Sequence, residues 1–119
     1  MSEEAFHPTR VPGAEEAVAP DHKFTDYLLN LEHPIGGAKA RFFLSIGWSP
    51  DRWQELRDHF LAQLPLVEGR FSRVNDFNGA ADYEAVIELP RENGEMVRVG
   101  TYWQVHPDQS TKFLTAYPL

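Results

Sequence analysis

The spacing of hydrophobic and polar positions divides the chain into a helical first half and a second half built from strands. After Asp21, which suits an N-cap, apolar residues recur at the i, i+3, i+4 and i+7 positions of an amphipathic helix. They are Phe24, Tyr27, Leu28 and Leu31. Pro34 disfavours a helical conformation at His33, so this helix should end near residues 30–32.

Two further helices are predicted. The second should run from about Gly37 to Ile46, with Gly47 closing it. The third should begin at Ser49 as its N-cap, with Pro50 at the first helical position, and should end at Pro65. The positions expected to face the core are Ala38, Phe42, Phe43 and Ile46, followed by Trp53, Leu56, Phe60 and Leu64.

From about Gly69 onward the period changes to two, which predicts strands. A weak strand is expected around Phe71 to Phe77, with a turn at Asn78-Gly79. Clearer strands follow, and their apolar face alternates with polar residues. The positions on this face are Tyr83, Ala85, Ile87 and Leu89, then Val97, Val99, Thr101, Trp103 and Val105, and finally Phe113, Thr115 and Tyr117.

Register arithmetic tests the two hairpins. A two-residue turn at Asn93-Gly94 would pair Ile87 with Gly100, apolar against polar, so we expect a longer or bulged connection there. A five-residue loop over residues 106–110 instead keeps every pair on one face. The pairs would be Val105 with Thr111, Trp103 with Phe113, Thr101 with Thr115, and Val99 with Tyr117.

This order of elements predicts the α+β class, with about three N-terminal helices packed on one face of an antiparallel meander of about four strands. Residues 1–20 carry three prolines, two Glu-Glu pairs and no sustained period, so we expect a flexible acidic tail there, which could still lie over the body through Phe6 or Val11. Residues 21–119 should form a single α+β domain.

Composition narrows the functional classes. The chain has 119 residues, 42% of them hydrophobic, which is enough for one packed core. No cysteine is present, so disulfides and thiolate chemistry are excluded. No apolar run reaches the roughly 18 residues of a membrane span, and no secretory-type opening is seen, so we expect a soluble cytoplasmic protein. The net charge of −7 argues against a basic surface that grips DNA or RNA as a whole, but not against a small basic site.

The segment HPIGGAKARFF (residues 33–43) carries the most chemistry. His33 precedes a proline in the turn before a helix, and Lys39 and Arg41 lie in the first turns of that helix. These cations, together with free backbone N–H groups, suit a phosphate, and Gly36 and Gly37 would let a ligand approach closely. The ordinary alternative is that His33 is a capping or packing residue and that both cations are merely solvated.

Three polar residues on the expected core face of the sheet are further candidates. Thr101, Thr115 and Tyr117 could donate hydrogen bonds opposite His33 and Lys39. The ordinary alternative is that they occur here only because Thr and Tyr have a high propensity for strands. The five histidines lack metal-ligand spacing and no carboxylate cluster accompanies them, so neither a metal nor another cofactor is expected.

The motif at 33–43 and the ending TAYP at 115–118 resemble a family of small bacterial domains of unknown function, over residues 21–119. The layout is also similar to the barnase–EndoU–colicin–RelE group of metal-independent ribonucleases, many of which are toxins of bacterial conflict. This resemblance implies RNA cleavage through the 2′-OH, with His33 as acid or base and Lys39 and Arg41 on the phosphate. Thr101, Thr115 or Tyr117 would orient the phosphate. Since no second histidine is well placed, the remaining catalytic role would fall to Lys39 or Tyr117.

Two functions therefore stay open. One is a ribonuclease-like enzyme that binds RNA at a local site. The other is a non-catalytic binding, scaffold or immunity domain of the same fold, whose acidic charge would mask a basic protein partner.

Overall fold

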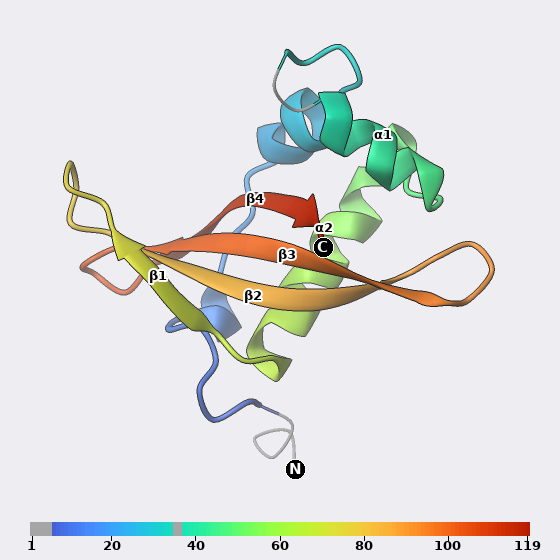
Figure 1. The fold of residues 1–119 in the computed structure, drawn as a ribbon. Helices are drawn as coiled ribbons and strands as arrows, with labels where there is room; N and C mark the ends of the chain where they lie inside the picture. The colour runs from blue at the N-terminus through green and yellow to red at the C-terminus, as the bar shows by residue number, and fades with distance from the viewer. Residues whose placement is uncertain (1–5, 35–36) are drawn as a thin grey trace.

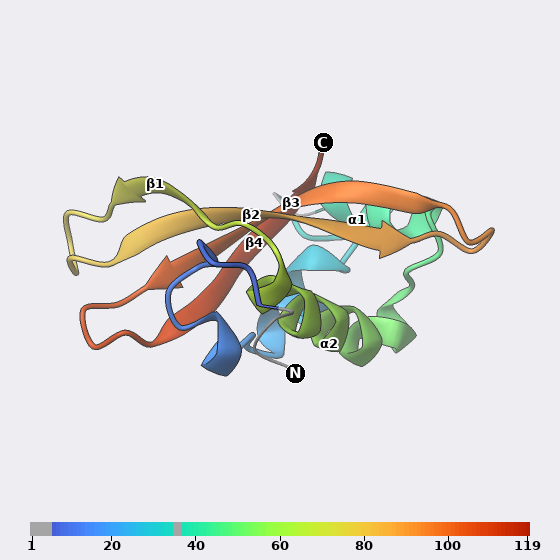
Figure 2. The same cartoon turned by 90° about the horizontal axis from the view of Figure 1, so that it is seen from below.

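A four-stranded antiparallel sheet forms the second half of the chain, in a computed structural model that describes residues 6–34 and 37–119 (Figure 1). The strands are β1 (Arg70–Val74), β2 (Ala81–Pro90), β3 (Met96–Val105) and β4 (Thr111–Pro118). They are ordered β1-β2-β3-β4, so each strand pairs with its neighbour in sequence. Figure 2 shows the long helix on one side of this sheet, which confirms the predicted α+β class and the meander.

The helices precede the sheet in the chain, as predicted. They are η3 (Phe24–Leu28), α1 (Gly37–Ser45) and α2 (Trp53–Gln63), and α2 is flanked by the 3-10 turns η4 (Pro50–Arg52) and η5 (Leu64–Leu66). A further 3-10 turn, η2 (Ala14–Glu16), lies in the N-terminal segment. In Figure 1, α2 crosses behind the sheet, while η3 and α1 lie beside β4.

The first helix differs from the prediction because η3 is a π-helix. Leu29 N–H donates to Phe24 O at 3.0 Å, five residues back, and this wider turn shifts the helical face by one residue. Leu29 is consequently buried, whereas Leu31, predicted to face the core, is 48% exposed.

The second helix begins where it was predicted, but its buried face is rotated. Gly37, Ala40 and Phe43 face the core, whereas Ala38 is exposed and Phe42 is half-buried. Gly37 lies so close to Leu31 that a Cβ would come within 2.8 Å of the Leu31 carbonyl oxygen, which fixes the rotation. Gly36, the other glycine considered for ligand approach, lies outside the described residues.

The hairpin registers are partly as predicted. Pro90 pairs with Met96, so the β2–β3 connection is longer than two residues, as expected. Val105 pairs with Thr111 and Trp103 with Phe113, which confirms the first half of the β3–β4 ladder.

A bulge then changes the second half of that ladder. Leu114 is the extra residue, and beyond it Tyr102 pairs with Thr115, Thr101 with Ala116, and Gly100 with Tyr117. The predicted pairs of Thr101 with Thr115 and Val99 with Tyr117 are therefore wrong. The bulge places the small, fully buried Ala116 on the core face where a regular strand would place larger polar side chains.

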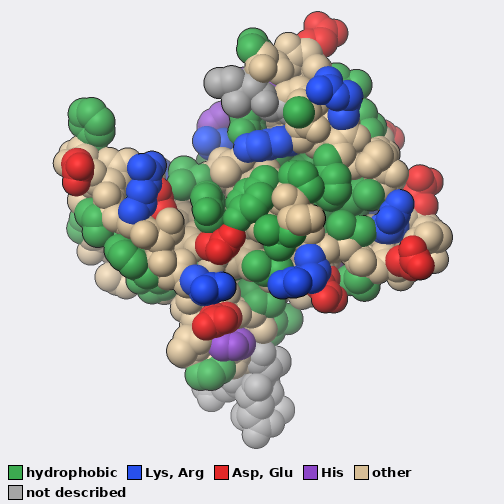
Figure 3. Space-filling view, in the orientation of Figure 1, with side chains coloured by type: hydrophobic (Ala, Val, Ile, Leu, Met, Phe, Trp, Pro, Cys, Tyr) green, Lys and Arg blue, Asp and Glu red, His purple; other side chains and the backbone are tan. Residues whose placement is uncertain are grey.

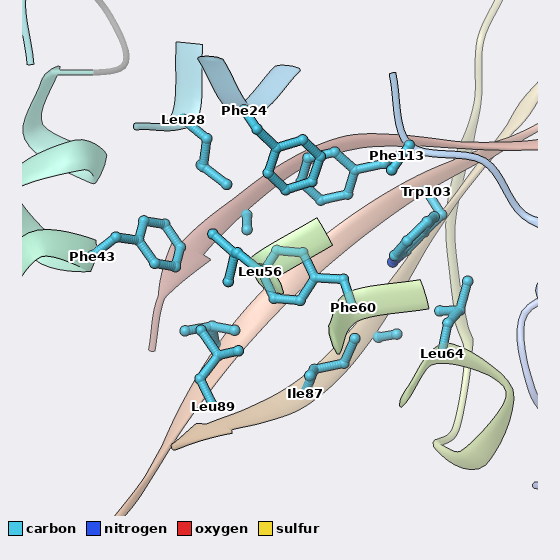
Figure 4. Packing of buried hydrophobic residues seen from close by; sticks show 14 of the residues in the cluster. Phe24, Leu28, Phe43, Leu56, Phe60, Leu64, Ile87, Leu89, Trp103 and Phe113 are labelled. Carbon is cyan, nitrogen blue, oxygen red and sulfur yellow. The ribbon is translucent and has the colours of Figure 1, made fainter. Parts of the chain in front are cut away.

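Aromatic rings from helices and strands meet in the core (Figure 4). The ring of Phe113 lies 5.1 Å from that of Phe24, 5.7 Å from Phe60 and 5.3 Å from Trp103, measured between centroids. All four side chains are buried. This cluster holds η3 against β4 and so fixes the position of every side chain that η3 carries.

Residues 6–20, which the sequence assigns to a flexible tail, pack along the body. Val11 is fully buried, Gly69 N–H donates to Thr9 O at 2.9 Å, and Val18 pairs in parallel with Lys112 at the outer edge of β4. This agrees with the contact that the sequence allowed through Val11: scattered apolar residues and backbone hydrogen bonds hold the segment, and neither leaves a periodic pattern in the sequence. Residues 1–5 of the predicted tail lie outside the described part.

The outer face of the sheet, which α2 does not cover, is mixed in character. Figure 3 shows apolar side chains over its middle, with basic and acidic side chains around them. Tyr117 lies against Gly100 on this face, where a Cβ at Gly100 would come within 2.4 Å of the tyrosine ring. None of the helices in the described ranges is long and apolar enough to span a bilayer.

Candidate functional site

Three side chains from three separate elements meet at the outer edge of β4. Lys39 of α1 donates from Nζ to Tyr27 Oη of η3 at 2.7 Å and to Thr115 Oγ1 of β4 at 2.9 Å. The two hydroxyl oxygens lie 3.3 Å apart and share a further hydrogen bond. All three residues are half-buried, so the ammonium is held in a defined position with access to solvent.

The fold explains how these residues come together. Tyr27 follows Phe24 by three residues on η3, and Phe24 is anchored in the aromatic core. Thr115 comes directly after the bulge at Leu114, which takes it out of the core-facing series of β4. Lys39 lies one residue from the buried Ala40 on α1, whose docking brings the ammonium to both hydroxyls.

The surroundings of Tyr27 alter its acidity. Burial raises the pKa of the Tyr27 hydroxyl, but hydrogen bonds with Lys39 and Thr115 and the positive charges of Lys39 and Lys23 outweigh that effect. The net result is a pKa below the ordinary value for tyrosine. Lys39 Nζ also lies 5.2 Å from the centroid of the Tyr27 ring, a cation–π distance.

A groove of about 520 Å³ opens beside this cluster. We call it the Tyr27 groove, and its lining residues are His22, Lys23, Asp26, Tyr27, His33, Leu114 and Thr115. The His33 ring meets the Tyr27 ring edge-on, with 5.0 Å between centroids. An imidazole and a phenol therefore lie side by side at one opening, and the ammonium of Lys39 contacts the phenol beside it.

The structure brings some of the predicted site residues together and keeps others apart. His33, Lys39 and Thr115 gather around Tyr27. Arg41 is exposed on α1 and does not line the Tyr27 groove.

Thr101 is fully buried in the core face of the sheet. Its Oγ1 donates to Ala85 O at 2.6 Å and accepts from Trp103 Nε1 at 2.7 Å. These bonds satisfy the hydroxyl inside the protein. The expectation that Thr101 faces His33 and Lys39 is therefore wrong.

Tyr117 lies on the outer face of the sheet, because the bulge at Leu114 reverses its direction. Its hydroxyl donates to Glu84. Burial and hydrogen bonds with Glu84 and Tyr102 raise the pKa of Tyr117 well above the ordinary value. Its hydroxyl is therefore engaged on β2, and Tyr117 is not among the residues that line the Tyr27 groove.

Tyr27 is the site residue that sequence reasoning missed. Its helical spacing with Phe24 and Leu28 assigned it to the core, although a half-buried tyrosine commonly carries its hydroxyl to a polar partner. Lys23, one turn before it, also went unnoticed. Among the described residues, no three His, Asp or Glu side chains are grouped so as to hold a metal ion.

The structure thus defines a small α+β domain with an ammonium–phenol–imidazole cluster at the edge of a meander sheet. The chain belongs to a family of domains of unknown function, DUF6883, whose model matches residues 10–119. No curated protein sequence matches it.

The fold is similar to that of a solved structure, a chain from a contact-dependent growth inhibition toxin–immunity protein complex of Klebsiella pneumoniae 342. The TM-score is 0.63 at 16% sequence identity, and the alignment covers 91% of this chain and 97% of the other. At this identity the likeness establishes a shared fold and nothing more.

Proposed function

We propose that this chain is a metal-independent ribonuclease domain of a bacterial toxin–immunity system, with its active site at the Tyr27 groove. One observation carries the proposal: Tyr27 and His33 line one open groove, and Lys39 donates a hydrogen bond to the Tyr27 hydroxyl and helps to lower its pKa. Within the described residues Lys39 has no carboxylate partner, so its charge is available to an anion.

The reaction needs a base, an acid and stabilisation of a charged phosphate. The 2′-hydroxyl oxygen of the RNA attacks the adjacent phosphorus while its proton passes to the base. The bond from phosphorus to the 5′-oxygen breaks, and that oxygen takes a proton from the acid. The products are a 2′,3′-cyclic phosphate and a free 5′-hydroxyl.

The residues of the groove match these roles. Tyr27 in its phenolate form accepts the 2′-hydroxyl proton, and the neighbouring Lys39 favours that form. Protonated His33 supplies the proton to the leaving oxygen. Lys39 and Thr115 stabilise the oxygens of the phosphate as negative charge develops on them.

The fold comparison supports this proposal only through the architecture. The name of the similar structure speaks of a toxin and of an immunity protein, and both are compatible with this chain. A second candidate function is therefore a non-catalytic immunity or binding domain. The net charge of −7 favours it, because an acidic protein is suited to masking a basic partner.

Incubation with total RNA in excess chelator tests the proposal. Wild-type protein should release fragments that end in a 2′,3′-cyclic phosphate. Lys39→Ala should reduce the rate on the order of 10²–10³-fold, because it removes the charge that stabilises the transition state. Tyr27→Phe and His33→Ala should each be strongly impaired.

Arg91→Ala is the matched control, since Arg91 is an exposed cation in the β2–β3 connection, outside the Tyr27 groove. Its activity should equal that of wild type. Cleavage that persists in Lys39→Ala would exclude this site, and absence of cleavage by folded wild-type protein would favour the non-catalytic candidate.

A further inference from the structure

A second cation lines the Tyr27 groove, at some distance from the reacting cluster. Lys23 precedes Tyr27 by four residues, and both lie on one continuous helical stretch that includes η3. Four residues correspond to about 6 Å along a helix axis. Lys23 and Tyr27 therefore stand about one helical turn apart in the same opening.

Lys23 and the Lys39–Tyr27 pair therefore supply positive charge at two points of the same site. Lys23 is half-buried and its charge is felt at the Tyr27 hydroxyl. Resting on the proposed function, we infer that the Tyr27 groove binds two consecutive phosphates of single-stranded RNA, the scissile one at Lys39 and its neighbour at Lys23. Lys23 is then a positioning residue that sets the substrate class.

The walls of the groove fit an unpaired nucleoside between the two phosphates. Leu114, the extra residue of the β4 bulge, provides an apolar side chain, and His22 and His33 provide flat rings. Unpaired bases stack on such rings, and a groove with cations along it follows the backbone of a single strand.

The charges around the groove are consistent with this ligand. Among the lining residues Lys23 is the one lysine and Asp26 the one carboxylate, and the ammonium of Lys39 lies beside the groove through its bonds with Tyr27 and Thr115. Asp26 Oδ1 accepts a hydrogen bond from Thr25 Oγ1 at 3.2 Å, which engages part of its charge. With Lys39 counted, two lysines face one carboxylate at this site, on a chain whose total charge is −7.

Direct binding tests this inference without requiring cleavage. The probe is a fluorescent mixed-sequence hexanucleotide with 2′-O-methyl groups, which cannot attack the phosphate. Fluorescence anisotropy should show saturable binding that weakens several-fold in Lys23→Ala. The slope of log affinity against log salt should become shallower by about 0.7, the value for one lost contact with a single strand.

Lys112→Ala is the control, because Lys112 is an exposed lysine of β4 outside the groove. It should bind the probe as wild type does. The same hexanucleotide annealed to its complement should bind more weakly than the single strand.

Equal binding by Lys23→Ala and wild type, or equal binding of duplex and single strand, would overturn the inference. The failure of the catalytic proposal looks different: the probe would still bind through Lys23, but unmodified RNA would stay intact. Where cleavage occurs, Lys23→Ala should raise KM for a hexanucleotide several-fold and change KM for a dinucleotide much less, since a dinucleotide lacks the second phosphate.

Discussion

The ammonium of Lys39 holds the candidate site together. A lysine on a short helix would ordinarily extend into water, but here it is half-buried between two hydroxyls that come from η3 and β4. Hydrogen bonds of this kind are stronger when the donor is charged. The position of the cation is therefore a property of the fold.

Removal of Lys39 should raise the pKa of Tyr27. Lys39→Ala takes away the hydrogen bond and the charge that favour the phenolate, while the burial that opposes ionisation remains. A pH titration of the tyrosine Cζ signals by ¹³C NMR measures this, with Lys112→Ala as the control. A Tyr27 signal that titrates identically in Lys39→Ala would contradict the observed geometry.

Sequence reasoning proposed His33, Lys39 and Thr115 because they lie in two recognisable segments at 33–43 and 115–118, and the structure gathers them around Tyr27. It also placed Thr101 at the site, and this failed because a threonine on a core face can satisfy its hydroxyl internally. Here the Ala85 carbonyl and the Trp103 indole do so. The alternation pattern carries no information on which neighbour a buried hydroxyl will find.

Among the elements, β4 contains a bulge that the alternation of apolar and polar residues does not predict. The ladder was predicted correctly from Val105 to Trp103, where both faces of the hairpin agree. Beyond that point, a regular strand and a bulged strand fit the pattern of apolar residues equally well. The bulge prevails because it buries Ala116 and leaves the Tyr117 hydroxyl outside the core.

The outward position of Tyr117 predicts a loss of stability at alkaline pH. Its pKa is raised above the reference value of 10.0, so its contribution is fully present below about pH 10. As the pH rises further, the Tyr117 hydroxyl ionises in the unfolded state before it does so in the folded state. The contribution of Tyr117 to the free energy of unfolding therefore decreases until the pH passes the folded-state pKa.

Urea unfolding of wild type and Tyr117→Phe between about pH 8 and about pH 11 measures the effect. Tyr117→Phe should be less stable at the lower pH, because the bond to Glu84 is lost. The difference should narrow as the pH increases. Tyr83→Phe on β2 serves as the control, and a constant difference at all pH values would argue against the Tyr117–Glu84 contact.

The helix η3 was located correctly but its type was not. The spacing of Phe24, Tyr27 and Leu28 fits an α-helix as well as a π-helix over so few residues. The choice depends on tertiary packing, which buries Leu29 where an α-helical pattern would bury Leu31. The type of helix that such a short segment forms is determined by the core against which it packs.

For the molecule as a whole, the N-terminal segment is part of the folded unit. Gly69, which precedes β1, lies directly against the backbone of Val11, and a Cβ there would come within 2.5 Å of Val11 N. Thr111 Oγ1 also donates to Pro12 O at 2.6 Å. The contacts of this segment involve single residues and the backbone. Such contacts leave no pattern in the sequence, so composition indicated a solvated tail.

Gly69→Ala should therefore loosen residues 6–20. The new methyl group collides with backbone that cannot move aside cheaply, and we expect a loss of about 1–3 kcal/mol in the free energy of unfolding. Trypsin should cleave after Arg10 faster than in wild type. Glu68→Ala, an exposed neighbouring position, is the control, and an unchanged cleavage rate in Gly69→Ala would show that the segment does not depend on this contact.

The cluster at the edge of β4 has one more consequence. A lysine ammonium offers three N–H donors, and Lys39 gives one to Tyr27 and one to Thr115, which leaves the third for an incoming oxygen atom. The conformational entropy of the Lys39 side chain is therefore lost when the chain folds, and little more is lost when an anion binds. Lys39, Tyr27 and Thr115 are thus arranged before an anion binds. Structures of the protein with and without a bound anion should superimpose, with Lys39 in the same rotamer.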